Sequence, residues 1–338
     1  MKSVLRTYAV IAMTAAAGTT LAAPDKVFVA DEDGGTVSVL DAASFKKIAA
    51  VPVGREPHNV QISPDGKLAW VTNNGEQAMP GMGKGGHAAM ASGGEVWAID
   101  TGSHAVVAKI PVGKHPAHVV LAPDGRFAYV TNGGENTVSV VDTGARRVAA
   151  TIPVGAYPHG IRISPDGQEA YVANLKGGTV SVIDLRERKE VAQIPVGKGP
   201  AQTGFAPDGR LAFVSLSQEN KVALIDTATR KVLKKVSVGT VPIQVYATPD
   251  GSTLLVANQG TKQKPGNTVS LIELAGGKVV NTVRTGPGAH GVVVDREGRY
   301  AYVSNIYENS VSVLDVKSAK VVASVRVGEG PNGISVTP

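Results

Sequence analysis

The chain has 338 residues with a formal net charge of +6, and its 43% hydrophobic and 18% charged residues argue against a disordered chain. Long helices are disfavoured by its 40 glycines and 20 prolines. Cysteine is absent, which excludes disulfides, thiolate zinc sites, iron–sulfur ligation, a cysteine nucleophile and covalent c-type haem attachment.

The N-terminal segment has the features of a secretory signal peptide. Lys2 and Arg6 precede a mostly apolar stretch, and small residues then offer cleavage after Ala22 or Ala23. The apolar stretch is too short to span a bilayer, and no later segment is long and apolar enough to do so. We therefore expect residues 1–23 to be a signal peptide and the mature protein to be periplasmic or secreted, without a membrane span.

A repeated unit follows along the rest of the chain. It reads V-G-x-x-P, a short β-branched run, P-D-G and then a run such as Y-V-T-N. The glycines of its first step are spaced by 42 residues, except for two intervals that are longer by 17 and by 5 residues. These glycines are Gly54, Gly113, Gly155, Gly197, Gly239, Gly286 and Gly328. A period of this length indicates a repeat architecture.

Each unit contains four strand candidates, which we name A to D in chain order. In the unit after the longest interval they cover residues 117–122, 127–132, 137–142 and 147–154. The P-D-G between A and B predicts a tight turn, because proline presets φ and glycine accepts a left-handed conformation. Four short antiparallel strands in a repeat of about 40 residues are typical of a β-propeller blade.

The two ends of the chain complement each other. Residues 27–31 have the pattern of a B strand, followed by C and D, and residues 332–336 have the pattern of an A strand. Paired by backbone hydrogen bonds, the two ends complete one blade and remove a free sheet edge. The sequence therefore predicts an all-β, seven-bladed β-propeller over residues 24–338, with four antiparallel strands per blade and one blade shared by both termini.

The B-strand segments resemble those of the YVTN-repeat β-propellers. The resemblance is carried by A-W-V-T-N, A-Y-V-T-N, A-Y-V-A-N and A-Y-V-S-N at residues 69–73, 128–132, 170–174 and 301–305. That family includes exported bacterial propellers of the YncE type, archaeal surface-layer proteins and relatives of the haem-bearing propeller of periplasmic nitrite reductases. The resemblance covers essentially all of the expected mature chain and implies a seven-bladed disc with a central channel. It names no ligand.

The direction of the chain assigns each loop to a face. If the P-D-G turns define the bottom face, the B–C and D–A loops both lie on the top face. The two length excesses fall in B–C loops, one between Asn73 and Val96 and the other between Asn258 and Val269. Loops on a rigid scaffold are where function usually resides, so we predict that the top face carries the functional site.

Histidines gather in the D–A loops. His58, His159 and His290 occupy equivalent places at the start of A strands, and His118 lies one residue later. The other blades carry polar residues there, Gln202, Gln244 and Asn332. Two interpretations are open: a metal-binding ring at the channel mouth, or imidazoles that cap backbone groups between separate blades. The offset of His118 could turn its ring to the opposite side of the strand.

The longer insertion collects every methionine of the expected mature chain. It contains Met79, Met82 and Met90 together with His87. Thioethers are soft ligands that suit Cu(I), and imidazole suits copper in either oxidation state. This spacing predicts a copper-capture loop. The alternatives are another metal or a haem-like ligand, or a glycine-rich loop whose methionines are incidental or oxidation-sensitive.

Other functions have weaker support in the sequence. Basic residues are spread over the starts of D strands, the outermost strands, where they block edge pairing, so we do not expect a nucleic-acid groove. No nucleophile elbow, phosphate-binding glycine motif or triad spacing is present, which favours binding over catalysis. We predict a monomer that meets another exported protein on its top face. The alternatives are a ligand-free interaction scaffold, a single-stranded DNA-binding propeller, and a lactonase or redox propeller.

Overall fold

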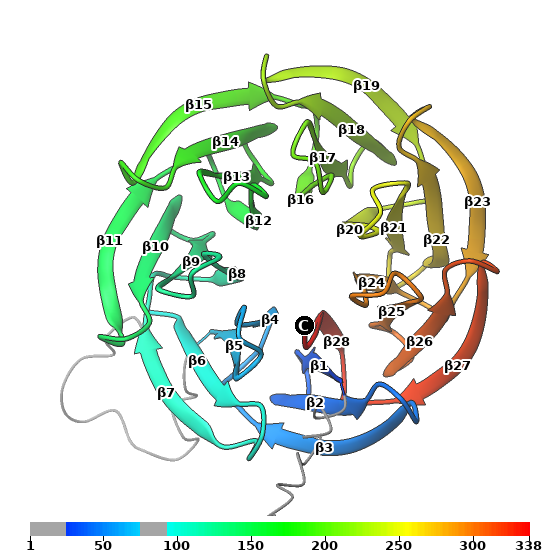
Figure 1. The fold of residues 1–338 in the computed structure, drawn as a ribbon, viewed down its shortest axis with the longest axis horizontal. Helices are drawn as coiled ribbons and strands as arrows, with labels where there is room; N and C mark the ends of the chain where they lie inside the picture. Colours follow the sequence, from blue (N-terminus) through cyan, green and yellow to red (C-terminus); the bar gives the residue numbers. More distant parts are fainter. Residues whose placement is uncertain (1–24, 75–92) are drawn as a thin grey trace, which may run out of the picture.

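The computed structural model describes residues 25–74 and 93–338. These residues form 28 strands and no helix, and the strands build seven four-stranded antiparallel sheets arranged as the blades of a ring (Figure 1). The seven-bladed β-propeller expected from the repeats is confirmed. No described residue belongs to a helix that could cross a bilayer.

The two inner strands of each blade correspond to A and B of the repeat. The innermost strands, which enclose the central channel, are β4 (Val60–Ile62), β8 (Pro116–Leu121), β12 (Pro158–Ile163), β16 (Pro200–Phe205), β20 (Pro242–Ala247), β24 (Ala289–Val294) and β28 (Pro331–Val336). The second strands are β5 (Leu68–Asn73), β9 (Phe127–Asn132), β13 (Glu169–Asn174), β17 (Leu211–Leu216), β21 (Thr253–Gly260), β25 (Tyr300–Asn305) and β1 (Lys26–Asp31).

The two outer strands correspond to C and D. The third strands are β6 (Glu95–Asp100), β10 (Thr137–Asp142), β14 (Thr179–Asp184), β18 (Lys221–Asp226), β22 (Pro265–Glu273), β26 (Ser310–Asp315) and β2 (Thr36–Asp41). The outermost strands are β7 (Val106–Pro111), β11 (Arg147–Pro153), β15 (Lys189–Pro195), β19 (Lys231–Ser237), β23 (Lys278–Arg284), β27 (Lys320–Arg326) and β3 (Lys46–Pro52). The predicted boundaries differ from these by one residue at most in the unit worked out from the sequence.

The ring is closed by a blade that contains both ends of the described chain. Its strand order is β28-β1-β2-β3, and β1 pairs antiparallel with β28 so that Phe28 lies opposite Ser335. The backbone N–H of Lys26 also donates to the Thr337 hydroxyl (2.9 Å). Closure by the terminal strands is therefore confirmed, and β28 covers the edge of β1 that would otherwise be free.

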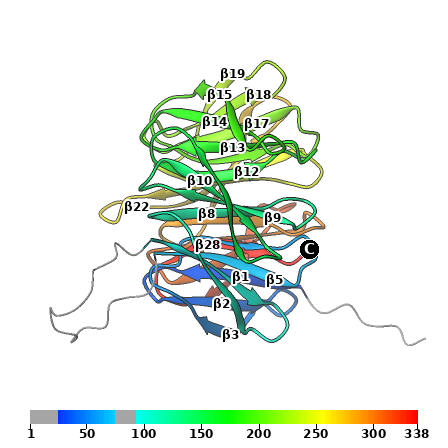
Figure 2. The same cartoon turned by 90° about the vertical axis from the view of Figure 1, so that its left-hand side faces the viewer.

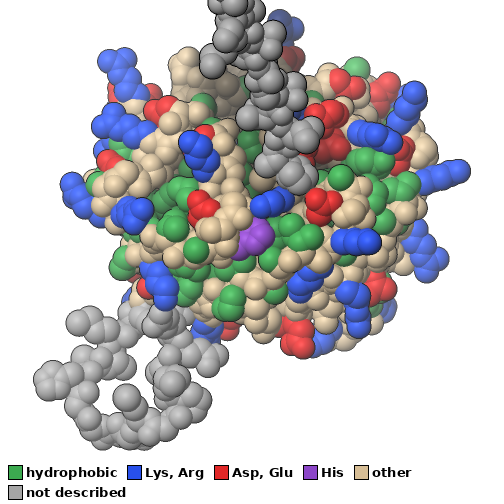
Figure 3. All heavy atoms as spheres, turned by 60° about the horizontal axis from the view of Figure 1, so that its bottom comes forward, with side chains coloured by type: hydrophobic (Ala, Val, Ile, Leu, Met, Phe, Trp, Pro, Cys, Tyr) green, Lys and Arg blue, Asp and Glu red, His purple; other side chains and the backbone are tan. Residues whose placement is uncertain are grey.

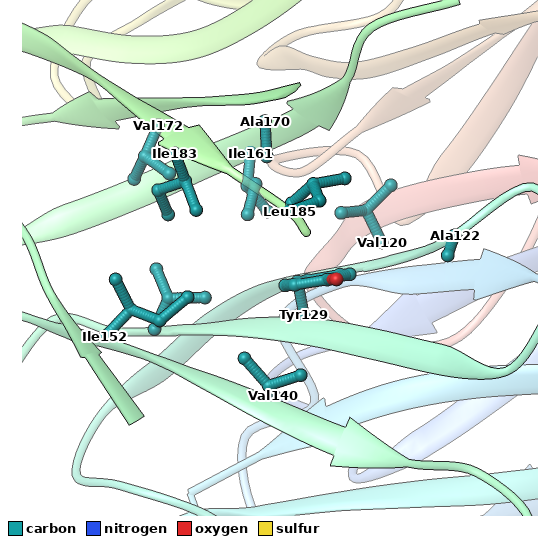
Figure 4. Packing of buried hydrophobic residues seen from close by; sticks show 11 residues of the cluster. Val120, Ala122, Tyr129, Val140, Ile152, Ile161, Ala170, Val172, Ile183 and Leu185 are labelled. Atoms are coloured by element: carbon teal, nitrogen blue, oxygen red, sulfur yellow. The ribbon is translucent and has the colours of Figure 1, made fainter. Parts of the chain in front are cut away.

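Each pair of neighbouring blades shares a core of interdigitating side chains. Between the blades β8–β11 and β12–β15, the Tyr129 ring packs with Val140 and Ile152 on one side and Ile161 and Ile183 on the other (Figure 4). Seven such clusters occur among the described residues, one at each blade interface. Burial of this apolar surface between blades is what holds the ring together.

The two faces of the disc are distinct. The bottom face carries the P-D-G turns and the C-terminus, and the top face carries the turns between second and third strands. The five-residue insertion lengthens the β21–β22 hairpin, where Gly260 pairs with Pro265 beyond the usual last pair, and Figure 2 shows this hairpin projecting from the face opposite the C-terminus. The longer insertion connects β5 to β6 on the top face, and its residues 75–92 lie outside the described residues.

Candidate metal centre

Each innermost strand is entered through a sharp turn on the top face. In six blades the residue just before the innermost strand has a positive φ, and in the blade of β4 the positive φ falls on Glu56, two positions before His58. The six residues are His115, Tyr157, Gly199, Val241, Gly288 and Gly330. Glycine tolerates this conformation, whereas a side chain such as that of Val241 carries a strain of roughly 1 kcal/mol or more. The turn brings the chain from the rim to the channel, so the next residues stand at the channel mouth.

Four histidines meet at this mouth, and we call them the histidine cluster: His58, His118, His159 and His290. The ring centroid of His58 lies 5.6 Å from that of His118, 5.1 Å from that of His159 and 6.4 Å from that of His290. The His118 and His159 centroids are 5.0 Å apart. One nitrogen each from His58, His118 and His159 lies within 4.8 Å of the other two. The histidines therefore do not point into separate blade interfaces.

The offset of His118 by one residue does not turn its ring away from the others. The pairing of β8 with β9 shifts register between Pro116 and Val119, and β12 shifts in the same way against β13 between Pro158 and Ile161. At such a bulge the strict alternation of side chains is interrupted. The alternation rule thus fails at the first residues of the strand, which is where the histidines lie.

Hydrogen bonds fix the tautomers of two cluster members. Nδ1 of His58 lies 3.1 Å from Oε1 of Glu32, and Nδ1 of His159 lies 2.9 Å from the Ala201 carbonyl oxygen. Both oxygens only accept, so each Nδ1 carries the proton and each neutral ring has its lone pair on Nε2. The amide nitrogen of Asn332 is 3.2 Å from the His58 Nδ1, but it donates to the other Glu32 oxygen (2.6 Å). The two Nε2 atoms face each other at 3.1 Å.

The other two members have nitrogens without partners. Nδ1 of His290 lies 3.2 Å from Oε1 of Gln259, whose amide nitrogen donates to the Tyr307 hydroxyl (3.1 Å). The Nε2 of His290 is buried and forms no hydrogen bond of regular geometry among the described residues, although the Asn332 side chain lies close enough to raise the pKa of this ring. His118 is completely buried, and neither of its ring nitrogens has a described partner. Buried polar atoms are nearly always paired, so these bare nitrogens need an explanation.

Burial disfavours the charged form of three cluster members, His118, His159 and His290. It lowers the pKa of His159 to about 4 and that of His290 to about 3, with a smaller contribution from the charge of His58 in each case. Burial, assisted by His159 and His58, also lowers the pKa of His118 well below its usual value. For Glu32, burial raises the pKa, but the charge and hydrogen bond of His58 and the hydrogen bond from Asn332 outweigh it and bring the pKa to about 2.

The geometry suits a transition-metal ion. Neutral imidazole nitrogen is a ligand of zinc, copper, nickel and iron, with bonds of about 2.0–2.1 Å to zinc. Two nitrogens 3.1 Å apart, each bonded to one ion at that distance, subtend an angle of about 100° at the ion. A carboxylate or carbonyl oxygen behind the other ring nitrogen is the usual support of a metal-binding histidine, and Glu32 and Ala201 provide it.

Comparison with known proteins identifies the family. A family model described as "YNCE-like beta-propeller" matches residues 83–252 and 236–338. The chain belongs to the YNCE-like β-propeller family. Among solved structures, this propeller is similar to "Kuenenia stuttgartiensis Hydrazine Synthase", with 26% identity, a TM-score of 0.71, and coverage of 82% of this chain and 88% of that one. No curated protein sequence matches the chain significantly.

Two more distant structures share the fold alone. The dihydro-heme d1 dehydrogenase NirN, in complex with DHE, is 19% identical with a TM-score of 0.65, covering 92% of this chain and 74% of that one. The Pseudomonas aeruginosa periplasmic gluconolactonase PpgL is 21% identical with a TM-score of 0.73, covering 94% of this chain and 99% of that one. At these identities the likeness does not transfer an activity to this YNCE-like propeller.

The remaining predicted residues divide into three groups. Asn332 joins the cluster indirectly, through its hydrogen bond to Glu32. Gln202 and Gln244 are buried and do not join it: the Gln202 side chain fills the space beside Gly160, and the Gln244 amide oxygen accepts from the Val292 backbone (3.3 Å). The predicted copper loop with Met79, Met82, His87 and Met90 lies outside the described residues.

Two supporting residues were missed in the sequence, Glu32 and Gln259. Each immediately follows the last B-strand residue of the repeat, Asp31 in β1 and Asn258 in β21. Four of the other five blades have Gly133, Leu175, Ser217 and Ile306 at this place, and the fifth has Asn74, so long polar side chains stand out there. The sequence offered this signal, because the B–C turn and the D–A loop share the top face.

Basic and acidic side chains are mixed on the surface of the disc. Lys and Arg side chains are scattered over the face seen in Figure 3, with Asp and Glu among them. Several basic residues are engaged by acidic neighbours, including Arg230 with Glu169 (2.6 Å) and Lys235 with Glu219 (2.9 Å).

Proposed function

We propose that this YNCE-like propeller is an exported metal-binding protein whose histidine cluster holds a transition-metal ion, with copper as its natural metal. The observation that carries the proposal is the pair of Nε2 atoms of His58 and His159, 3.1 Å apart, whose Nδ1 atoms are both held by oxygen acceptors. Two lone pairs that face each other at this distance repel unless a cation lies with them.

A proton is the simplest rival to a metal ion. His58 can become an imidazolium that pairs with Glu32 and donates its Nε2–H to His159, which satisfies this pair of rings. It leaves the buried nitrogens of His118 and His290 without partners, at about 1–3 kcal/mol for each unsatisfied group. One metal ion would give lone pairs of several rings a partner at once, and this favours the metal.

Copper is favoured among the metals by two features of the sequence. Divalent copper binds nitrogen ligands more strongly than its first-row neighbours, and the donors that converge here are all imidazoles. The segment that contains Met79, Met82, His87 and Met90 starts from the same blade and the same face as His58, and thioethers suit Cu(I). The segment and the cluster would together serve both oxidation states, and the top face would be where a metal-carrying exported partner docks.

Metal analysis and titration test the proposal. Untagged protein purified from a periplasmic extract should contain copper in a near-stoichiometric amount. Metal-stripped protein should bind Cu(II) in a chelator competition, with nitrogen coupling in its electron paramagnetic resonance spectrum. The variant with both His58→Ala and His159→Ala should lose affinity at least a hundredfold, because it removes two ligands and exposes the remaining ones to water.

A matched control separates the cluster from histidines in general. His115 precedes β8 on the same face but is exposed and outside the cluster, and asparagine tolerates its positive φ. His115→Asn should therefore bind copper like the wild type. Equal affinities for the wild type and the double variant would contradict the proposal. Zinc or nickel in the purified protein would keep the site and overturn copper as its metal.

A further inference from the structure

Two cavities lie at the opposite end of the channel, near the bottom face. One, of about 330 Å³, is an open pocket bordered by three successive innermost strands, β12, β16 and β20. The other, of about 390 Å³, adjoins it, and Tyr246 and Pro249 line both. Prolines of the P-D-G turns form the rim of the first cavity, so it opens toward the bottom face. None of its lining residues belongs to the histidine cluster.

The first cavity is lined by residues at one equivalent position of three neighbouring blades. In each blade, one innermost-strand residue lies opposite the middle residue of the second strand: Gln61, Val120, Arg162, Gly204, Tyr246, Val293 and Ser335. Arg162 is the charged member of this set. Gly204 lies between Arg162 and Tyr246 in the ring of blades, and the Phe213 ring packs against its backbone where a Cβ would otherwise point. The result is a space with a cation on one side and a phenol on the other.

The Arg162 guanidinium lacks a counter-ion. It donates to the neighbouring Ile161 carbonyl (3.0 Å), and within residues 25–74 and 93–338 no carboxylate forms an ion pair with it. Burial lowers the pKa of Arg162, but arginine stays protonated at neutral pH. A partly buried cation without a partner is costly, and an anion in the adjoining cavity would offset that cost.

We propose that this cavity binds a small organic carboxylate with an apolar body. The guanidinium of Arg162 would hold the carboxylate in a two-pronged contact, and the Tyr246 hydroxyl would donate a further hydrogen bond. The remaining walls, which include Phe205 and Val245, are apolar and match a ring or a short hydrocarbon chain. Phosphate fits less well, because one cation would face two negative charges among apolar walls.

Paired probes test the proposal on the unmodified protein. Calorimetric titration would compare 2-naphthoate with 2-naphthamide, and octanoate with octanamide, so that each pair differs mainly in charge. At least one carboxylate should bind at least tenfold more tightly than its amide. Failure of both carboxylates to bind, or equal affinities for acid and amide in both pairs, would overturn the proposal without any variant.

Substitution of Arg162 then locates the site. Arg162→Gln should weaken carboxylate binding at least tenfold and leave amide binding unchanged, whereas Arg162→Lys should weaken it less because the charge remains. Arg55→Gln is the matched control, since this arginine is exposed on the top face beside Glu56. The melting temperature of each variant reports whether it is folded. Unchanged carboxylate affinity in a folded Arg162→Gln protein would place the site elsewhere and refute the assignment.

Discussion

The same seven innermost strands build the top and the bottom end of the channel. Among the described residues, the groups that lack a partner are imidazole nitrogens without a hydrogen bond at the top and a guanidinium cation without an ion pair at the bottom. At the top, imidazole nitrogens of His118 and His290 have no regular hydrogen bond, and the carboxylate of Glu32 lies beside His58. At the bottom, the guanidinium of Arg162 has no carboxylate beside it. Three residues apart along β12, His159 and Arg162 contribute to the two different ends. The comparison shows how a propeller sets its chemistry with single residues on an unchanged frame.

Removal of the closing strand should damage both ends at once and has the largest expected effect. Truncation of residues 331–338 deletes β28, which supplies Asn332 at the top and lines the second cavity at the bottom. The edge of β1 would be exposed and the interface with β4 lost, so the free energy of unfolding should fall by several kcal/mol. Thermal unfolding followed by circular dichroism measures this loss.

The control for that truncation is a chain that lacks only Pro338, which lies beyond β28. It should melt close to the wild-type temperature. A full truncation that melts like this control would mean that the terminal strand does not close the ring. Retention of metal binding by the full truncation would show that the top end is independent of closure.

Acidification should destabilise the metal-free protein through the top end. His159 has a folded pKa of about 4 and His290 of about 3, against about 6.5 in the unfolded chain, so below pH 6.5 the unfolded state binds more protons. Stability therefore falls as the pH decreases from 6.5 toward 4, by roughly 3 kcal/mol for His159 alone. Glu32 adds a loss in the same direction, because its lowered pKa stabilises the fold above pH 4.5 and that contribution fades toward pH 2.

Denaturant titrations at a series of pH values measure this effect. His290→Gln removes one titrating ring without a new charge, so its stability should depend less steeply on pH between 6.5 and 4. His115→Asn, outside the cluster, should keep the wild-type slope. A wild-type stability that is flat over this range would contradict the assignment of buried, uncharged imidazoles.

Glu32→Gln should weaken metal binding without removing a ligand. The carboxylate orients His58 and raises the electron density on its ring, and loss of such a support usually reduces metal affinity by about 10- to 100-fold. Glu56→Gln is the control, because Glu56 is a half-buried carboxylate on the same face that contacts Arg55 and Asn74 and no cluster histidine. Copper competition titrations on both variants decide the question. Equal losses of copper affinity in the two variants would mean that Glu32 acts only through its negative charge and not by orienting His58.

The fold was predictable because its determinants are local and repeated. The P-D-G turns, the alternating strands and the complementary termini recur with a fixed period, so one unit interpreted correctly gives all seven. The pairing of β1 with β28 followed from the strand types at the two ends, with no long-range information. Some of the boundary errors of one residue arise at prolines such as Pro116 and Pro331, which begin strands without donating to the ladder.

The candidate site was only partly predictable, because convergence in space is not a local property. The sequence placed His58, His118, His159 and His290 at one face, but the ring contacts depend on bulges that a period of two does not describe. The support from Glu32 and the position of Arg162 between Gly204 and Tyr246 depend on which blades are neighbours and on side-chain size at one register position. Such information appears only once the ring is assembled.

The smallest expected effect distinguishes a hydrogen bond from a charge at the bottom end. Tyr246→Phe removes one hydroxyl from the wall that faces Arg162 and leaves the apolar surface in place. Loss of a single hydrogen bond contributes about 0.5–1.5 kcal/mol, so carboxylate affinity should fall about 2- to 10-fold and amide affinity should hardly change. Copper binding at the top should be unaffected in the same protein, because Tyr246 does not touch the histidine cluster. A loss of carboxylate affinity as large as that in Arg162→Gln would instead mean that Tyr246 positions the guanidinium. The bottom end would then depend on both residues and not on the charge of Arg162 alone.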